Sequence, residues 1–217
     1  MKMNKLVIAG AILACQALPA MAQPGGQAEQ DTSMSFFITS RGLGDGANLG
    51  GLAGADAHCS ALAEAAGTRG KTWRAYLSTT GRNGVNAKDR IGDGPWYNAN
   101  GELVGRSVMD IHYSNANLNK QRSVTENGDT VNGVGDTPNQ HDILTGTNPD
   151  GSASDMTCNN WTSNTDEYRA TVGHFDRVGG GAMAESWNAA HPSRGCSQEQ
   201  LQASGGNGYY YCFATGE

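Results

Sequence analysis

Four cysteines constrain the fold of this 217-residue chain more than any other feature. A fifth cysteine lies in an N-terminal segment that has the features of a secretory signal. The remaining even number, in an oxidising compartment, favours two disulfide bonds. None of the four belongs to a Cys-x-x-Cys motif, which argues against a zinc ribbon or a thioredoxin-type site. Spacing alone leaves three pairings open for Cys59, Cys158, Cys196 and Cys212.

The first 22 residues predict export. A cationic start precedes an apolar run at Leu6–Leu18 that is too short to span a bilayer, and small residues at Ala20–Ala22 offer a cleavage site after Ala22. Acylation at Cys15, which would make a lipoprotein, is an alternative. No later segment approaches the roughly 20 apolar residues of a transmembrane helix. We therefore expect a secreted or periplasmic protein without a transmembrane segment.

The mature chain is acidic and poor in apolar residues. Loss of Lys2 and Lys5 with the signal leaves 13 basic residues against 21 acidic ones, a net charge near −8. This balance excludes a general binder of nucleic acid or of anionic membranes. Apolar residues make up 37% of the chain, and glycine contributes 31 residues, so a helical bundle is not expected.

Hydrophobic periodicity predicts one α+β domain over residues 34–217, after a flexible leader at 23–33. Trp96 and Tyr97, with Gly, Pro and Asn around them, are the aromatic residues most favoured for exposure, where a sugar ring could stack. The predicted elements are a strand at 36–39, a helix at 52–66, a strand at 73–78 with one face in the core, short strands or turns over 83–151, and a terminal strand at 208–214 that pairs with the first.

Sequence segments in one order carry a family pattern. They are Ser35–Ser40, Gly51–Cys59, Thr72–Ser78, Cys158–Thr162, Gly195-Cys196 and Tyr210–Phe213. Together they resemble the endostatin-like branch of the C-type-lectin-like fold, and more closely the bacterial secreted proteins called lectin-like. The resemblance implies a small mixed or antiparallel sheet, one main helix, long loops and nested disulfides, Cys59–Cys212 and Cys158–Cys196. It also implies a binding module rather than a particular activity.

The calcium site of sugar-binding C-type lectins is only partly matched. Glu185–Ala189 resembles the family's Trp-Asn-Asp strand through Trp187 and Asn188, but Ala189 stands where a carboxylate belongs. The family's proline loop is missing between Cys158 and Trp187, and Asn148-Pro149-Asp150 resembles it only superficially. Calcium requires several oxygen ligands, so we expect direct hydrogen bonding to a ligand without a standard calcium site.

Histidines with neighbouring carboxylates form a second candidate site. His141-Asp142, His174 with Asp176, and His191 lie in Gly- and Asn-rich sequence. Such residues build metal sites, acid–base pairs or polar ligand pockets. In the alternative interpretation each histidine caps a loop. Arg177 could add a fork of donors for a carboxylate or phosphate.

These observations predict an exported binding module for a glycan or another polar cell-surface ligand. No nucleophile, metalloprotease, phosphate-loop or dinucleotide motif indicates an enzyme. The alternatives are a protein-interaction or structural envelope domain and a metal-dependent hydrolase. No cofactor is expected, with calcium or zinc as the possible ions. The predicted ligand-binding residues are His141, Asp142, Asn148, Asp150, His174, Asp176, Arg177, Trp187 and Asn188.

Overall fold

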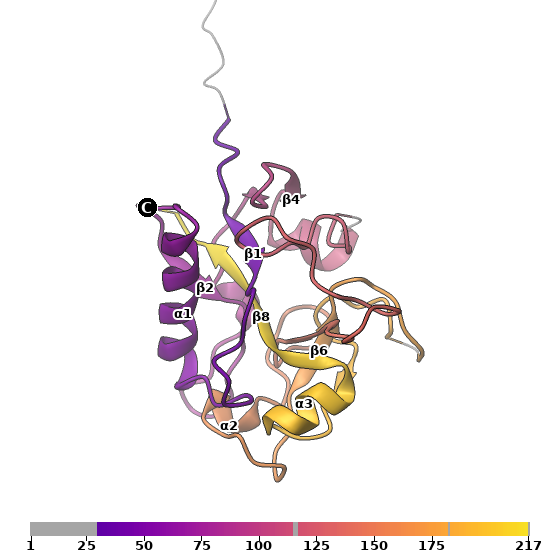
Figure 1. Ribbon diagram of the computed structural model, residues 1–217. Helices are drawn as coiled ribbons and strands as arrows, with labels where there is room; N and C mark the ends of the chain where they lie inside the picture. Colours follow the sequence, from indigo (N-terminus) through magenta and orange to yellow (C-terminus); the bar gives the residue numbers. More distant parts are fainter. Residues whose placement is uncertain (1–29, 115–116, 182, 217) are drawn as a thin grey trace, which may run out of the picture. The chain divides into compact units, whose positions relative to one another are not determined.

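The computed structural model describes residues 30–114, 117–181 and 183–216 (Figure 1). The predicted signal at 1–22 and most of the predicted leader lie outside these residues. The elements in chain order are β1 (Phe36–Ile38), α1 (Gly51–Ala65), β2 (Trp73–Ala75), the 3₁₀-helix η1 (Ala87–Asp89), β3 (Trp96–Tyr97), β4 (Leu103–Gly105), the π-helix η2 (Asp110–Ser114), β5 (Asp142–Leu144), α2 (Cys158–Trp161), β6 (Thr171–His174), β7 (His191–Pro192), α3 (Gln198–Ser204) and β8 (Gly206–Ala214).

The C-terminal strand β8 organises the main sheet. Its C-terminal half pairs antiparallel with both β1 and β2, which therefore lie along its two edges (Figure 1). Its N-terminal half pairs in parallel with β5, and the sheet continues antiparallel through β6 to β7. The predicted pairing of the first and last strands is confirmed by Phe36 opposite Phe213. A mixed sheet with few helices confirms the α+β class.

Helix α1 follows the predicted helical spacing. Ala55, Cys59, Leu62 and Ala63 are buried, so one face of α1 packs on the core. The helix ends at Ala65, and Gly67, two residues later, adopts a left-handed φ of 89°. The Gly67 N–H then donates to the Glu64 carbonyl, which satisfies one of the last helical carbonyls. Among the described residues no helix is both long and apolar enough to cross a membrane.

Both faces of the sheet are buried. Because side chains alternate along a strand, Phe37 and Tyr210 pack with α1 on one face, whereas Phe36 and Tyr211 belong to a second core on the other. The prediction of a single buried face at 73–78 is therefore wrong, since Tyr76 is also fully buried. Segments that contain only short helices and strands cover this second face.

The β3–β4 hairpin supplies part of that cover. Trp96 and Tyr97, which the sequence favoured for exposure, are only 1% and 7% exposed. The Trp96 ring meets Phe213 edge-on at 5.2 Å between centroids, and its indole N–H donates to the Ala214 carbonyl. The neighbouring Gly-Pro and Asn residues are typical of an exposed turn, but the contact with β8 buries the pair. The expectation that these two aromatic residues are exposed is therefore wrong.

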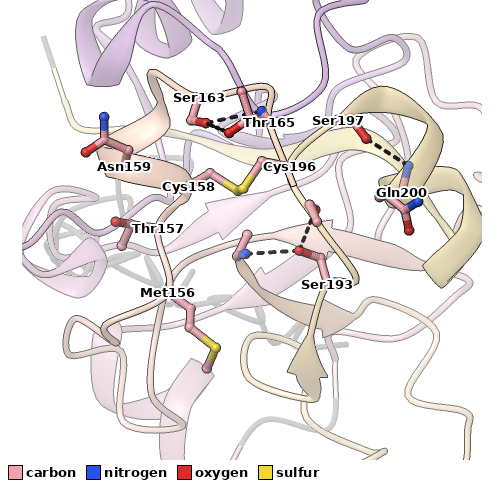
Figure 2. The surroundings of a disulfide bond; sticks show 12 residues. Met156, Thr157, Cys158, Asn159, Ser163, Thr165, Ser193, Cys196, Ser197 and Gln200 are labelled. Carbon is pink, nitrogen blue, oxygen red and sulfur yellow. Dashed lines mark hydrogen bonds between the residues drawn. A yellow bond between two sulfur atoms is a disulfide. The ribbon is translucent and has the colours of Figure 1, made fainter. Parts of the chain in front are cut away.

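Two disulfides hold the elements together. Cys59–Cys212 joins α1 to β8 across 153 residues, and Cys158–Cys196 joins the start of α2 to the segment before α3. Figure 2 shows the second bond beside the Ser197–Gln200 turn that begins α3. The pairing implied by the family resemblance is confirmed.

The short element α2 is a left-handed turn. Its four residues have φ values of 48°, 53°, 55° and 66°, in a region that costs about 1–2 kcal/mol per non-glycine residue. Two of the four are Asn159 and Asn160, and asparagine is the side chain that tolerates this conformation best. Asn160 binds both backbone groups of Thr80, which ties the turn to the loop after β2.

Candidate metal centre

Pairing between β5, β6 and β7 brings the predicted histidines together. Asp142 is the first residue of β5 and lies opposite His174, the last residue of β6. His191, on β7, lies opposite Val172, two residues before His174 and on the same face of the sheet. His141 directly precedes β5. These strands thus place three imidazole rings around the Asp142 carboxylate, and we call these four residues the histidine cluster.

One carboxylate oxygen is the centre of the histidine cluster. The Asp142 Oδ1 atom lies 3.2 Å from His141 Nε2, 3.3 Å from His174 Nε2 and 3.4 Å from His191 Nε2. The His141 and His174 rings stack at 4.1 Å between centroids, and His191 meets His174 edge-on at 4.9 Å. Asp142 is 2% exposed, whereas the His191 side chain is 36% exposed. The cluster is therefore buried on three sides and reaches solvent beside His191.

The opposite nitrogen of each ring fixes its orientation. The Nδ1 atom of His174 contacts the Ala184 carbonyl at 2.8 Å, that of His191 contacts the Pro192 carbonyl at 2.9 Å, and that of His141 contacts the Asp176 carboxylate at 3.2 Å. Carbonyl and carboxylate oxygens only accept, so each Nδ1 must carry the proton. In the neutral rings all three Nε2 atoms then present lone pairs toward Asp142.

Polar atoms at the centre of the cluster lack hydrogen-bond partners. Among the residues that the structure describes, Asp142 Oδ1, Asp142 Oδ2 and His174 Nε2 are buried and form no hydrogen bond. The contacts from Asp142 have the length of hydrogen bonds but not their direction. A buried carboxylate that faces nitrogen lone pairs is unfavourable without a shared cation. Either protons on the rings or a metal ion must therefore complete this arrangement.

Electrostatics in the metal-free fold follow from this crowding. Burial works against ionisation of Asp142, but the neighbouring imidazoles of His174 and His191 outweigh burial and lower the pKa of Asp142. The contact with Asp142 raises the pKa of His191, against an opposing effect of burial. A proton is thus the competitor of a metal ion here.

Ligand types and spacing fit a first-row transition metal. In a tetrahedral site with bonds of about 2.0–2.1 Å, two ligand atoms lie about 3.3 Å apart. The three distances from Asp142 Oδ1 fall at this value, and one ligand atom each from His141, Asp142 and His174 lie within 4.8 Å of one another. His191 has this spacing to Asp142 Oδ1 but lies outside that group of three. Imidazoles with one carboxylate suit zinc and its neighbours. Calcium prefers six to eight oxygen ligands, so the cluster does not fit it.

Asp176 supports the cluster from behind His141. Its Oδ1 atom faces His141 Nδ1, and its carboxylate accepts the N–H groups of Val134 and Val178. Burial opposes ionisation of Asp176, but these donors outweigh burial and lower its pKa. A carboxylate behind a ligating imidazole orients the ring and increases its basicity. The sequence grouped Asp176 with the histidines, and the structure gives it this supporting position.

The other predicted ligand residues lie apart from the histidine cluster. Asn148 and Asp150 belong to one surface turn, in which Asp150 accepts from Ser152 and pairs with Lys88. Trp187 is buried and donates its indole N–H to the Ile111 carbonyl. Asn188 is buried and donates to Tyr76 Oη and to the carbonyls of Asn148 and Pro149. These contacts give both buried side chains a packing role.

One cleft of about 660 Å³, which we call the Trp187 cleft, is nevertheless lined by Arg177, Trp187 and Asn188. Sequence reasoning missed His112 on its wall. Tyr76 Oη donates to His112 Nε2 at 2.6 Å, because His112 Nδ1 is engaged with the Val108 carbonyl. Burial lowers the pKa of His112. No local motif marks His112, since its contacts come from Tyr76, just after β2, and from Val108 in the segment before it.

Sequence reasoning also missed Gly205 and Gly206, which join α3 to β8. Gly205 ends α3 at a φ of 103°, and its carbonyl accepts the Asp142 N–H. A Cβ atom on Gly205 would lie 3.2 Å from His141 Cδ2. The Gly-Gly pair was a usable signal, because consecutive glycines often mark a close approach of other groups to the backbone.

Comparison with known proteins adds no family to this description. No protein-family model matches the chain, and no curated protein matches its sequence.

Proposed function

We propose that this protein is an exported domain that binds a divalent transition metal, with zinc as the best-fitting ion, through His141, Asp142, His174 and His191. The observation that carries the proposal is the buried Asp142 Oδ1 atom, which faces three imidazole nitrogens without a hydrogen bond. The Nδ1 contacts hold the rings in the tautomer that a metal requires. Two disulfides support function in an oxidising compartment, as the predicted signal suggests.

Metal binding would also stabilise the short strands that carry the ligands. Strand β7 has only two residues, and β5 has three. An ion held by His191, His174 and Asp142 would join β5, β6 and β7 by coordinate bonds. Binding free energy at such a site becomes folding free energy of the segments that carry its ligands. The metal would therefore stabilise this edge of the sheet.

Titration of the chelator-treated mature protein tests the proposal. We expect one zinc ion per chain by elemental analysis and calorimetry, with a higher melting temperature in zinc and no response to calcium. Asp142→Asn preserves the shape of the side chain but should abolish high-affinity binding. His58→Ala is the matched control, because His58 lies on α1 and contacts Arg41 rather than the cluster. Equal zinc binding by wild type and Asp142→Asn would refute the proposal.

Glycan recognition is a second candidate function, supported by the Trp187 cleft. Tyr113 lines this cleft and is 67% exposed, so its ring offers an apolar face to a pyranose. Arg177 and Glu185 add polar groups on the same wall. Calorimetry against envelope polysaccharides, with Tyr113→Ala as the variant, tests it: binding that Tyr113→Ala leaves unchanged, or no binding at millimolar concentrations, excludes this cleft.

A further inference from the structure

We propose that His191 is the exchangeable ligand of the metal centre and that the ion enters and leaves past its ring. The other three residues of the histidine cluster hold the ion during this exchange. The inference rests on the proposed metal centre and deepens it, because it makes the bound metal transferable. A zinc ion that only stabilises a fold is enclosed by its protein ligands, whereas here one ligand of the four reaches solvent.

Exposure separates His191 from the rest of the histidine cluster. Its side chain is 36% exposed, against 8% for His141, 1% for Asp142 and 3% for His174. Side chains that reach solvent change rotamer within nanoseconds, whereas close-packed interiors resist such movement. The His141 and His174 rings also stack on each other. His191 is therefore the ligand that turns away from the ion most easily.

The contacts at Nδ1 show the same difference between the rings. His141 and His174 place Nδ1 against the buried acceptors described above. His191 Nδ1 contacts the carbonyl of the next residue, Pro192, in an exposed position. Water replaces an exposed acceptor at little net cost, whereas loss of a buried one leaves an unsatisfied donor. Rotation of the His191 ring therefore costs less free energy than rotation of the other two.

His191 also lies on the outermost strand of the main sheet. Strand β7 has two residues and ends the sheet beside β6. His174 and Asp142 lie on β6 and β5, farther inside the sheet. A short edge strand is held by few contacts and opens at lower free energy than the strands inside a sheet. The backbone at His191 can therefore move while the other ligands keep their places.

Three ligands remain when His191 turns away. One ligand atom each from His141, Asp142 and His174 lie within 4.8 Å of one another, in a group that does not include His191. Zinc is held by three protein ligands in sites whose fourth position accepts an outside ligand. In the exchange step the bond from zinc to His191 Nε2 breaks, and a bond from zinc to a donor atom of the incoming ligand forms. The charge of the ion does not change, and uptake is the reverse of this step.

Displacement by free imidazole tests which ligand exchanges. Imidazole offers the same donor as the ring that it replaces, and it is added to zinc-loaded mature protein with isotope-labelled histidines. Long-range proton–nitrogen NMR spectra distinguish zinc-bound from free Nε2 atoms. We expect His191 alone to lose its zinc-bound signal, with one zinc ion still present per chain. His58 and His112 make their contacts outside the cluster and serve as references.

Release kinetics test the same exchange through a second observable. Zinc-loaded protein is mixed with an excess of the chromogenic chelator pyridylazoresorcinol. The wild-type release rate should increase with the chelator concentration, because the chelator attacks at the position that His191 vacates. His191→Ala should release zinc at least about tenfold faster, since loss of even a supporting group weakens such sites about 10–100-fold. It should take up zinc no more slowly than wild type. His174→Ala, which removes a buried ligand, is the matched comparison and should lose tight binding.

The outcomes separate this inference from the proposed function. A protein that binds no zinc overturns both. Zinc binding in which imidazole displaces His141 or His174, or none of the three rings, overturns the inference alone. A wild-type release rate that does not depend on chelator concentration, or slower uptake by His191→Ala, also overturns it, because His191 would then be an ordinary ligand. If His174→Ala does not fold, the imidazole experiment on the wild type decides alone.

Discussion

Two buried carboxylates in this fold have opposite surroundings. Asp56, on α1, is 8% exposed and accepts hydrogen bonds from Arg74, Arg90 and the Ala75 N–H, all between 2.8 and 2.9 Å. Asp142 is 2% exposed and faces three imidazole nitrogens at 3.2–3.4 Å without a hydrogen bond. One carboxylate is fully satisfied by the protein, and the other is not.

The difference lies in the partners. A guanidinium is always charged and only donates, so the pairs of Asp56 with Arg74 and Arg90 are complete within the chain. An imidazole can be neutral and then offers a lone pair, so the surroundings of Asp142 become favourable when a proton or a metal is added. Buried charge thus stabilises the fold at Asp56, and under the proposed function it would bind an ion at Asp142.

Removal of the two carboxylates should separate these roles most strongly. Asp56→Ala leaves Arg90, whose side chain is 12% exposed, without its partner, so we expect a loss of about 3–5 kcal/mol with or without zinc. Asp142→Ala in chelator should cost much less, because no hydrogen bond to this carboxylate is lost. Urea unfolding of both variants in chelator measures this. Equal losses would show that Asp142 is also a structural residue.

Zinc should stabilise the wild-type chain by about 3–4 kcal/mol when its free concentration is 100–1,000 times Kd. For a domain of this size this corresponds to an increase in melting temperature of roughly 6–16 °C. Asp142→Asn should abolish the increase, whereas Asp56→Asn should lower the starting melting temperature and keep the increase. Calorimetric scans of both variants at matched zinc concentrations measure it. A zinc effect that survives in Asp142→Asn would place the ion elsewhere.

Asp176 should tune the metal site without being a ligand. Asp176→Ala removes the acceptor of His141 Nδ1 and should weaken zinc about 10–100-fold, as loss of a supporting carboxylate does. Asp176→Asn can still accept from His141 and Val178 through its one oxygen but loses the acceptor for Val134, so its effect should be smaller. Competition against a chromogenic chelator gives both affinities. Identical affinities in wild type and both variants would remove Asp176 from the site.

The pH dependence of stability contributed by His191 should have opposite signs in the metal-free and the zinc-bound protein. In the metal-free fold the raised pKa of His191 contributes stability below its ordinary value of about 6.5, and this stability is lost as the pH rises through the raised pKa. Zinc requires unprotonated nitrogens, so its contribution grows as the pH rises over the same window. Melting temperatures from pH 5.5 to 8, with zinc and with chelator, should diverge as the pH increases. Parallel curves would argue against metal ligation by His191.

We expect the smallest effect on stability and zinc affinity at a third carboxylate, that of Asp150. Asp150 lies at the surface, where hydrogen bonds from Ser152 and attraction to Lys88 lower its pKa to about 2. Exposed ion pairs contribute about 0–1 kcal/mol, so Lys88→Ala should leave stability and zinc affinity almost unchanged. Urea unfolding and chelator competition on this variant check both quantities. A large loss of zinc affinity would link this turn to the metal site after all.

Sequence reasoning succeeded for elements whose residue pattern lies within one continuous segment of the chain. Helix α1 carries a long periodic run and strand β8 a continuous aromatic one, and both were predicted within about two residues. The even number of cysteines predicted two disulfides, but only the family resemblance selected their pairing. Burial of Trp96 was not predictable, because it depends on contact with Phe213, more than a hundred residues away.

The candidate site was also predictable only in part. Residue types singled out the histidine cluster, together with Asp176, as possible ligands. Their convergence depends on the pairing of β5, β6 and β7, which have two to four residues each and give no periodic signal. The sequence also left the central role of Asp142 open, because only the fold places its Oδ1 atom between three rings.

The Cys59–Cys212 bond determines how the domain would carry a mechanical load. Tension applied to the two ends of the chain first peels β1 from β8, since Phe36 and Phe213 face each other at the same end of that antiparallel pair. The pull then reaches Cys59 and Cys212 and passes through their covalent link. The 152 residues between them bear no tension. The histidine cluster lies entirely within this protected stretch, so stretching the molecule would leave the geometry of the proposed metal site unchanged.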